Sequence, residues 1–240
     1  MRITIVQTRL QWEDGTTNRT LLAEKIRQLQ GQTDVVVLPE MFTTGFSMRA
    51  TALSEPLEGP AVAWMAEQAA FLNAALTGSF ICCENKRYFN RLVWMYPNGD
   101  YLLYDKKHLF ALAGEHEHYT PGQQRLLVKW QDWTICPLIC YDLRFPEWSR
   151  NTLADPYDLL LYVANWPARR ARHWQALLTA RAIENQCFTV GVNICGSDGQ
   201  GLEYQGDSCI VDYGGQVLVS LTAQEGIFTA TLDRSLQQAY

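Results

Sequence analysis

The sequence predicts an α/β domain, and three observations favour this fold class. Short apolar runs rich in β-branched residues alternate with longer stretches of helical period. Two glycine-containing turns, at Asn98-Gly99 and Gly214-Gly215, join pairs of strand-like segments as β-hairpins. No linker rich in Pro, Gly or Ser interrupts the 240 residues, so we expect a single domain covering residues 1–240.

In the first half of the chain, strands are expected around two helices. The apolar runs Ile3–Gln7 and Asp34–Leu38 are typical of buried strands, and a helix through Leu22–Leu29 separates them. Gly59-Pro60 begins the second helix, because Pro fits the first helical turn, and Gly78 is placed to end it. Further strands are expected at Ser79–Cys83, Arg91–Tyr96 and Tyr101–Asp105.

The second half repeats this alternation, with helices expected at Pro146–Leu153 and His173–Asn185. Strands are expected at Trp133–Cys140, Leu159–Asn165, Thr189–Ile194, Ser208–Tyr213 and Gln216–Leu221. One face of the second helix is expected to consist of Ala176, Leu177, Ala180 and Ile183. The glycine-rich stretch Gly196–Gly206 lacks the spacing of a phosphate-binding loop, so it is interpreted as an ordinary loop and nucleotide binding is not expected.

Composition excludes several classes of protein. Twenty Lys and Arg against 25 Asp and Glu give a net charge of −5, and 48% of the residues are hydrophobic. This balance argues against a disordered chain and against a nucleic-acid partner. The longest apolar runs fall well short of the roughly 20 residues that a membrane-spanning helix needs, so no membrane association is expected. An N-terminus without a signal-peptide pattern and seven cysteines inside mostly apolar segments predict reduced thiols and a cytoplasmic location.

Three reactive side chains follow predicted strands. Glu40 comes directly after the apolar run ending at Leu38-Pro39, Lys106 follows the hairpin strand, and Cys140 ends its strand before a polar segment. Loops at strand ends are held by the sheet yet face a crevice, so these positions are candidates for a site. Together they supply a nucleophile, a base and a fixed cation, because an ammonium can stabilise a thiolate and a carboxylate can accept the thiol proton.

Taken singly, each of these residues has an ordinary structural interpretation. Most buried cysteines act as small apolar residues, and this is our interpretation of Cys82, Cys83, Cys136, Cys187, Cys195 and Cys209. A carboxylate after a strand is usually solvated, and a lone lysine is usually a surface charge. The functional interpretation of Glu40, Lys106 and Cys140 therefore depends on their occurring together.

Four sequence blocks point to a family. Leu38–Phe42, Asp105–Phe110, Cys140–Glu147 and Ala180–Gln186 resemble, in order, the blocks of the nitrilase or carbon–nitrogen hydrolase superfamily. The resemblance covers nearly the whole chain. It implies a four-layer α-β-β-α sandwich, a Glu-Lys-Cys catalytic set without cofactor or metal, and a homodimer formed through helices beside the active site.

The resemblance assigns roles residue by residue. Glu40 matches the general base, Cys140 the nucleophile, and Lys106 the family lysine, since one variable residue separates it from His-Leu-Phe. A second glutamate six residues before Pro121-Gly122 is Glu115, which the resemblance implies holds the lysine. The backbone N–H of Tyr141 and the Lys106 ammonium are expected to stabilise the oxyanion.

Other residues are candidates for binding substrate. Phe46, Asn165 and Trp166 are interpreted as pocket lining or as core residues. A substrate carboxylate would need a cation, and the candidates are Arg144, Arg172 and Arg181. His116 and His118 lack a third ligand at typical zinc spacing, so no metal site is expected.

Within the superfamily, Pro39–Met48 and Glu115–Tyr119 are similar to the bacterial omega-amidase (2-oxoglutaramate amidase) branch. This similarity implies hydrolysis of the terminal amide of small dicarboxylic acid monoamides, such as 2-oxoglutaramate and 2-oxosuccinamate, through a cysteine thioester. A nitrile or N-carbamoyl hydrolase with the same catalytic residues is one alternative. A catalytically silent module that binds a small acid is an alternative of another class.

Overall fold

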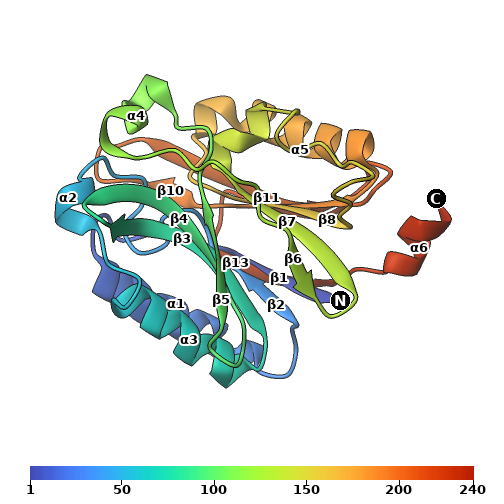
Figure 1. Cartoon of the computed structure of the whole chain (residues 1–240), viewed down its shortest axis with the longest axis horizontal. Coiled ribbons are helices and arrows are strands. Elements are labelled where there is room, and N and C mark those ends of the chain that lie inside the picture. The colour runs from blue at the N-terminus through green and yellow to red at the C-terminus, as the bar shows by residue number, and fades with distance from the viewer.

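Two β-sheets stacked face to face form the centre of the protein, and helices cover both outer surfaces. The computed structural model describes residues 1–240. Figure 1 shows the layers in order: helices α1 (Gly15–Ile26) and α3 (Pro60–Leu72), the first sheet, the second sheet, and helix α5 (Ala171–Asn185) on the opposite side. The expected four-layer α-β-β-α sandwich is therefore confirmed.

The first sheet has six strands in the order β13-β1-β2-β3-β4-β5. Its strands are β1 (Arg2–Gln7), β2 (Val35–Val37), β3 (Ala75–Glu84), β4 (Arg87–Met95), β5 (Tyr101–Asp105) and β13 (Gly226–Thr231). β1, β2 and β3 run parallel, so β2 ends in the centre of this sheet between two neighbours. The strand β13, which sequence analysis missed, pairs antiparallel with β1 and brings the C-terminal region back to the start of the chain.

The second sheet has the order β10-β11-β9-β8-β7-β6, with β12 paired to β11. Its strands are β6 (Val128–Trp130), β7 (Trp133–Ile139), β8 (Leu159–Ala164), β9 (Phe188–Asn193), β10 (Cys195–Ser197), β11 (Glu203–Val211) and β12 (Val217–Thr222). β7, β8 and β9 are parallel, so their carboxyl ends reach the same edge. The turns after β7 and β8 therefore lie side by side there.

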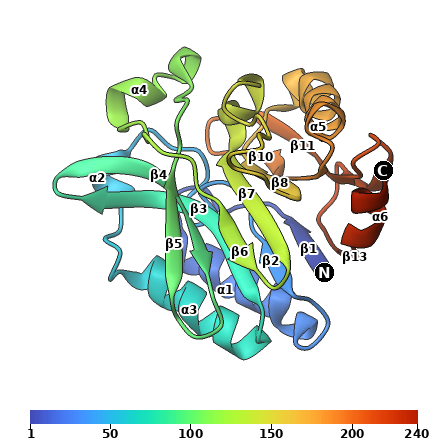
Figure 2. The same ribbon diagram turned by 45° about the vertical axis from the view of Figure 1, so that its right-hand side comes forward.

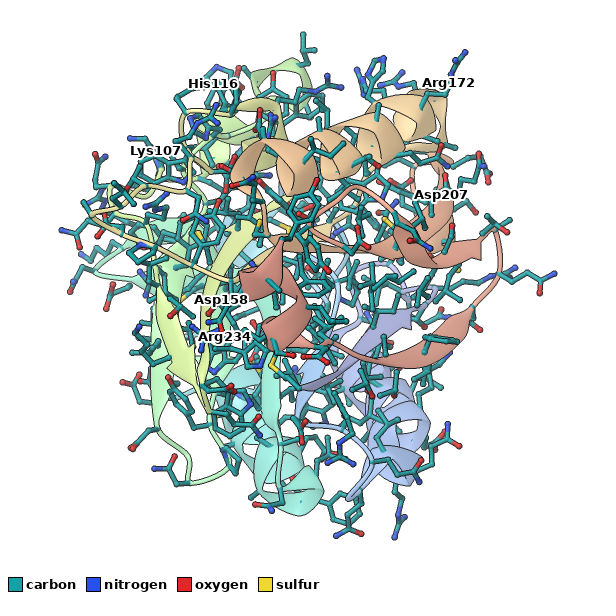
Figure 3. All side chains as sticks on the ribbon, turned by 90° about the vertical axis from the view of Figure 1, so that its right-hand side faces the viewer. Lys107, His116, Asp158, Arg172, Asp207 and Arg234 are labelled. Carbon is teal, nitrogen blue, oxygen red and sulfur yellow. The ribbon has the colours of Figure 1, made fainter.

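Helices α1, α3 and α5 pack on the outer faces, α2 and α4 lie in connections, and α6 ends the chain (Figure 2). They are α1 (Gly15–Ile26), α2 (Ala50–Leu53), α3 (Pro60–Leu72), α4 (Glu115–His118), α5 (Ala171–Asn185) and α6 (Arg234–Ala239). The terminal helix α6 is tied to the second sheet by an ion pair between Arg234 and Asp158 at 3.0 Å, which Figure 3 labels. No helix of this fold has the length and apolar character required to cross a bilayer.

The larger hydrophobic core lies between the two sheets and continues under helix α5. It contains residues from both, among them Ile5 and Val37 of the first sheet and Leu138 and Val163 of the second. A second core fills the space under α1 and α3. Because burial of apolar surface drives folding, the shared core holds the strand ends of the two sheets in fixed relation to each other.

The predicted end of the second helix was wrong. Helix α3 ends at Leu72 because Asn73 adopts a left-handed conformation, and Gly78 lies within strand β3 instead of ending the helix. A Cβ on Gly78 would lie 2.8 Å from the Cβ of Leu38, so the glycine permits close approach to the segment leading to Glu40.

The predicted helix Pro146–Leu153 does not form. The chain instead makes a turn, and the carbonyls of Ser149 and Arg150 accept hydrogen bonds from the Tyr157 hydroxyl and the Arg125 guanidinium. These side chains take the place of helical backbone donors. The Gly196–Gly206 segment is also not only a loop, since β10 pairs with residues 203–205 of β11.

Helix α5 is present, and the apolar face expected from the sequence is not the face that it buries. The side chains that it buries are Trp174, Leu178, Arg181, Ala182 and Asn185. The predicted face, by contrast, is half-buried or exposed, and Ile183 on it is 52% exposed. Apolar residues occur on both sides of this helix, so periodicity alone did not select the side that meets the sheet.

Candidate active site

Glu40 follows β2 and is completely buried. Its carboxylate accepts three hydrogen bonds, from Lys106 Nζ at 2.9 Å, from Asn90 Nδ2 at 2.7 Å and from the backbone N–H of Asn165 at 2.7 Å. The first two reach Oε1 and the third reaches Oε2. A buried carboxylate needs such donors, because an unpaired one would be costly. The side chain is thereby held in one orientation.

Lys106 follows β5 and lies between two buried carboxylates. Its Nζ is 2.9 Å from Glu40 and 2.9 Å from both oxygens of Glu115. Burial lowers the pKa of Lys106, but Glu115 and Glu40 outweigh this effect and raise the pKa above its ordinary value. The lysine is therefore a fixed cation. Burial, only partly opposed by Lys106, raises the pKa of Glu115.

Cys140 is the first residue after β7, where the chain turns into a short 3-10 helix (Cys140–Arg144). Its φ of 44° is in the left-handed region, which non-glycine residues rarely adopt. Burial and the nearby Glu40 raise the pKa of the Cys140 thiol, although Lys106 acts in the opposite direction. Lys106 therefore opposes the rise in the pKa of the thiol without overcoming it, and the sulfur depends on a base to accept its proton.

The turn after Cys140 is held by the buried carboxylate of Asp142. This carboxylate accepts hydrogen bonds from the Tyr104 hydroxyl at 2.6 Å, from the backbone N–H of Ile139 at 3.1 Å and from that of His108 at 2.9 Å. The donors come from three segments of the chain, β5, the loop after it and β7. Asp142 therefore fixes the segment carrying Cys140 relative to the segment carrying Lys106.

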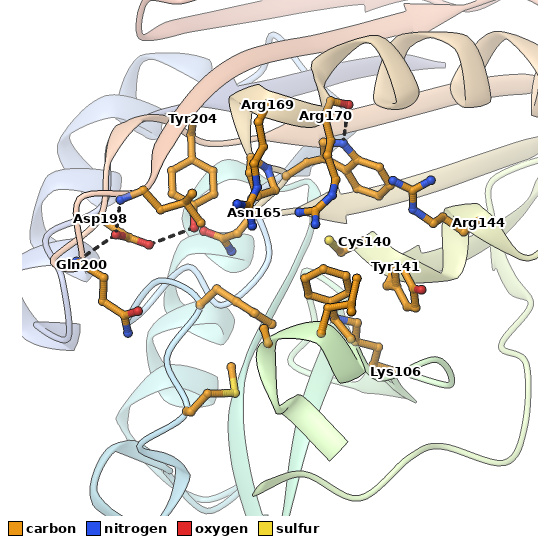
Figure 4. A pocket seen from close by; sticks show the side chains of 18 residues that line it. Lys106, Cys140, Tyr141, Arg144, Asn165, Arg169, Arg170, Asp198, Gln200 and Tyr204 are labelled. Atoms are coloured by element: carbon orange, nitrogen blue, oxygen red, sulfur yellow. Dashed lines mark hydrogen bonds between the residues drawn. The ribbon is translucent and has the colours of Figure 1, made fainter. Parts of the chain in front are cut away.

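A cavity of about 130 Å³ opens above these groups (Figure 4). Lys106 and Cys140 both line it, as do five residues that sequence analysis selected, namely Phe46, Tyr141, Arg144, Asn165 and Trp166. The remaining lining residues are Met48, Phe110, Leu112, Ala113, Pro167, Arg169, Arg170, Asp198, Gln200, Leu202 and Tyr204. Five chain segments far apart in sequence thus meet in one sheltered cavity.

Asn165 connects Glu40 to the cavity. In addition to the hydrogen bond from its backbone N–H to Glu40 Oε2, its side-chain Nδ2 donates to the backbone carbonyl of Glu40 at 2.5 Å. The buried Oδ1 of Asn165 has no partner within the protein. Asn193 in turn holds the next residue, since its side chain bonds both the N–H and the carbonyl of Trp166. The loop after β8 is therefore well fixed.

Sequence reasoning missed several residues at this site. Asn90, which bonds Glu40, could have been noticed as a single amide within the apolar strand β4.

Of the predicted arginines, Arg144 lines the cavity. Arg181 instead belongs to the buried side of α5, where it is 4% exposed and pairs with Glu184 at 2.9 Å. Arg172 projects from the start of α5 at the molecular surface, as Figure 3 shows.

The two histidines of helix α4 do not form a metal centre. His116 and His118 are both exposed, and no group of three His, Cys, Asp or Glu side chains is arranged to hold an ion. The carboxylates of Glu40 and Glu115 at the base of the cavity both bond the Lys106 ammonium. The reactive side chains gathered there are thus a thiol, two carboxylates and an ammonium.

This arrangement defines an enzyme of the carbon–nitrogen hydrolase family, to which the chain belongs: residues 2–240 match that family. The chain is 48% identical over 227 residues to an omega-amidase, YafV, of Escherichia coli strain K12, covering 94% of this chain and 86% of the relative. It is 36% identical to a 2-oxoglutaramate amidase of Bacillus subtilis strain 168, covering 83% and 78%.

A solved structure agrees with this assignment. A carbon–nitrogen hydrolase superfamily protein of Xanthomonas campestris, with an arsenic adduct in its active site, superimposes with a TM-score of 0.98. It is 45% identical, and the match covers 100% of this chain and 92% of that one. The chain is thus a hydrolase rather than a catalytically silent binding module.

Proposed function

We propose that this protein is an omega-amidase that hydrolyses the terminal amide of short dicarboxylic acid monoamides, such as 2-oxoglutaramate and 2-oxosuccinamate, to the acid and ammonia. The observation that carries the proposal is the cavity that Cys140 and Lys106 both line, with the Glu40 carboxylate 2.9 Å from the Lys106 ammonium. The names of the relatives support the choice of substrate class.

In the first half of the reaction Glu40 accepts the thiol proton while the Cys140 sulfur attacks the amide carbon. The resulting oxyanion is stabilised by the Lys106 ammonium and the backbone N–H of Tyr141. Glu40 then returns the proton to the amide nitrogen, the C–N bond breaks, and ammonia leaves. The acyl group remains on sulfur as a thioester.

In the second half Glu40 deprotonates a water molecule that attacks the thioester carbon. A second oxyanion forms in the same place, the C–S bond breaks, and the sulfur recovers its proton from Glu40. Glu115 touches neither substrate nor sulfur in this scheme: it positions Lys106 and balances its charge. The high pKa of the Cys140 thiol makes this proton transfer to Glu40 necessary at neutral pH.

Ammonia release tests the proposal. A panel of 2-oxoglutaramate, 2-oxosuccinamate, glutamine, asparagine, a simple nitrile and a carbamoyl amino acid should show preference for the two oxo-acid amides. Preference for the nitrile or the carbamoyl compound would instead favour the alternative hydrolase activities. A folded Cys140→Ala variant should release no ammonia above background, and release at the parent rate would refute the nucleophile assignment.

We also propose that the chain is a single-domain, cytoplasmic homodimer. Seven cysteines without a disulfide support a reducing compartment. The outward face of α5 supports the dimer, because Ile183 on it is 52% exposed and the neighbouring strand β12 exposes Val217 and Leu218 at 50% and 43%. Analytical ultracentrifugation should give a dimer, and Ile183→Glu should shift it toward monomer.

A further inference from the structure

Three arginines line the upper wall of the cavity without a carboxylate partner. Arg144, Arg169 and Arg170 project into it from the segments after β7 and β8 (Figure 4). None of them forms an ion pair with any Asp or Glu of the chain; the protein's ion pairs involve other cations. This cluster of positive charge is therefore not neutralised within the protein.

The one carboxylate among the cavity-lining residues is already occupied. Asp198 accepts hydrogen bonds from the Tyr204 hydroxyl at 3.0 Å and from the backbone N–H groups of Gln200 and Leu202 at 2.9 Å. The carboxylates deeper in the site, Glu40 and Glu115, face Lys106. No carboxylate in or below the cavity therefore forms an ion pair with these arginines.

Arg170 differs from the other two arginines. Its Nη1 is buried and has no hydrogen-bond partner, and its guanidinium lies 5.2 Å from the centre of the Phe110 ring. Arg144 has a partner in His173 Nδ1 at 2.9 Å, and Arg169 is exposed. A buried guanidinium donor without a partner is costly, so its place in the cavity indicates a ligand acceptor.

The surroundings of Arg170 strengthen this indication. Its carbonyl accepts from Trp166 Nε1 at 2.8 Å, and its N–H donates to the Pro167 carbonyl at 2.9 Å, so the backbone is fixed without help from the side chain. Burial and the neighbouring Arg169 and Arg144 lower the pKa of Arg170, as expected for a cation lacking a counter-ion. A bound anion would remove this repulsion.

We propose that Arg170 binds the free carboxylate of the substrate, at the end remote from the amide that Cys140 attacks. This inference rests on the proposed function and specifies its selectivity. The planar guanidinium can donate two parallel hydrogen bonds to a carboxylate, and the Phe110 ring supports its flat face. Arg144 and Arg169 add positive potential but are not the direct ligands. An amide without the carboxylate would leave Arg170 unpaired.

A pair of isosteric substrates tests the assignment. Glutaramate carries a carboxylate, whereas 5-oxohexanamide has a methyl ketone in its place and the same chain length. The quantity measured is the ratio of kcat/KM for glutaramate to that for 5-oxohexanamide, followed by ammonia release. Arg170→Met should lower this ratio by about 10- to 100-fold, the range for loss of a charge-assisted hydrogen bond. Arg170→Lys, which retains the charge, should recover part of it.

Arg172→Met is the matched control, because it removes the same charge two residues along the chain at an exposed position outside the cavity. Its ratio should stay within about 3-fold of the parent ratio, as for exposed charges generally. An equal fall in this control would mean a long-range field and would overturn direct binding. An unchanged ratio in Arg170→Met, or a fall found only in Arg144→Met or Arg169→Met, would overturn the assignment to Arg170.

The parent protein separates the two levels of inference. If it hydrolyses glutaramate and 2-oxoglutaramate, the proposed function stands whatever Arg170→Met does. If it hydrolyses neither, the proposed function fails and this inference fails with it. A binding measurement covers the case in which Arg170→Met is inactive: glutarate should inhibit alkylation of Cys140 by iodoacetamide in the parent but at least about 10-fold more weakly in Arg170→Met. Equal protection in both would overturn the proposal.

Discussion

Replacement of Glu40 by Gln changes one buried atom and should affect both stability and rate. The carboxylate accepts from Lys106 and Asn90 at Oε1 and from the Asn165 N–H at Oε2. A glutamine has one acceptor oxygen, so its NH2 group must face either the Asn165 N–H or the other two donors. At least one buried donor then loses its acceptor, which costs about 1–3 kcal/mol. This loss corresponds to roughly 2–12 °C in Tm for a chain of this size.

The loss of activity in Glu40→Gln should be much larger than the loss of stability suggests. Glu40 transfers a proton in both halves of the reaction, and general acid–base catalysis contributes about 10²–10⁴-fold to a step. We therefore expect kcat/KM for 2-oxoglutaramate to fall at least about 10³-fold, measured by ammonia release. Chemical denaturation and thermal unfolding give the stability change on the same samples.

Asp142→Asn is the control for this experiment. Asp142 is another fully buried carboxylate with several donors, but it does not line the cavity. Its variant should lose a similar amount of stability, about 1–3 kcal/mol, with a much smaller fall in rate. If Glu40→Gln keeps more than a tenth of the parent activity, or loses no more activity than Asp142→Asn, Glu40 is not the base.

Three further outcomes are expected. Gly191→Ala should destabilise the protein by about 1–3 kcal/mol, because its Cβ would lie 2.5 Å from a Leu178 methyl and 2.7 Å from Trp174; an unchanged denaturation midpoint would contradict this packing. Alkylation of Cys140 by iodoacetamide should accelerate steadily as pH rises from 7 to 9, because burial and Glu40 raise the pKa of the thiol; a plateau of the rate below pH 8 would refute it. Burial acts to raise the pKa of Glu225, but hydrogen bonds from Lys25, the Arg9 N–H and Thr8 outweigh it and lower this pKa to about 2. The stability that this carboxylate contributes is therefore present above its unfolded pKa near 4.5 and is lost as pH falls toward 2. Since Glu225 is 42% exposed, Glu225→Gln should cost about 1 kcal/mol at pH 7 and only a small fraction of that at pH 2 by denaturant unfolding; an equal cost at both pH values would contradict the linkage.

Much of the fold was predictable because local patterns and tertiary structure agree along most of the chain. Continuous apolar runs became the buried parallel strands, and Asn98-Gly99 and Gly214-Gly215 formed the expected turns. The predictions failed where local patterns were compatible with two structures. The segment Pro146–Leu153 has a helical pattern, but side chains from other parts of the chain bond its carbonyls.

The positions of Glu40, Lys106 and Cys140 could be selected from sequence because each follows a strand, and strand ends are where a rigid sheet presents side chains. The sequence alone also determined the family, since its blocks span nearly the whole chain. Sequence could not indicate that Asn90 would reach Glu40 from β4, because this contact depends on how two strands align across the sheet.

Only the tertiary structure decided three properties of the protein. It turned the apolar Ile183 face of α5 outward, because Trp174 and Leu178 on the other side pack against the second sheet. It raised the pKa of the Cys140 thiol, since burial and a nearby carboxylate together outweigh one ammonium. It left Arg170 in the cavity without an acid partner. The physical reason is common to all three. The burial of a residue and the charges around it depend on neighbours from distant parts of the chain, and these neighbours come together only once the two sheets have packed.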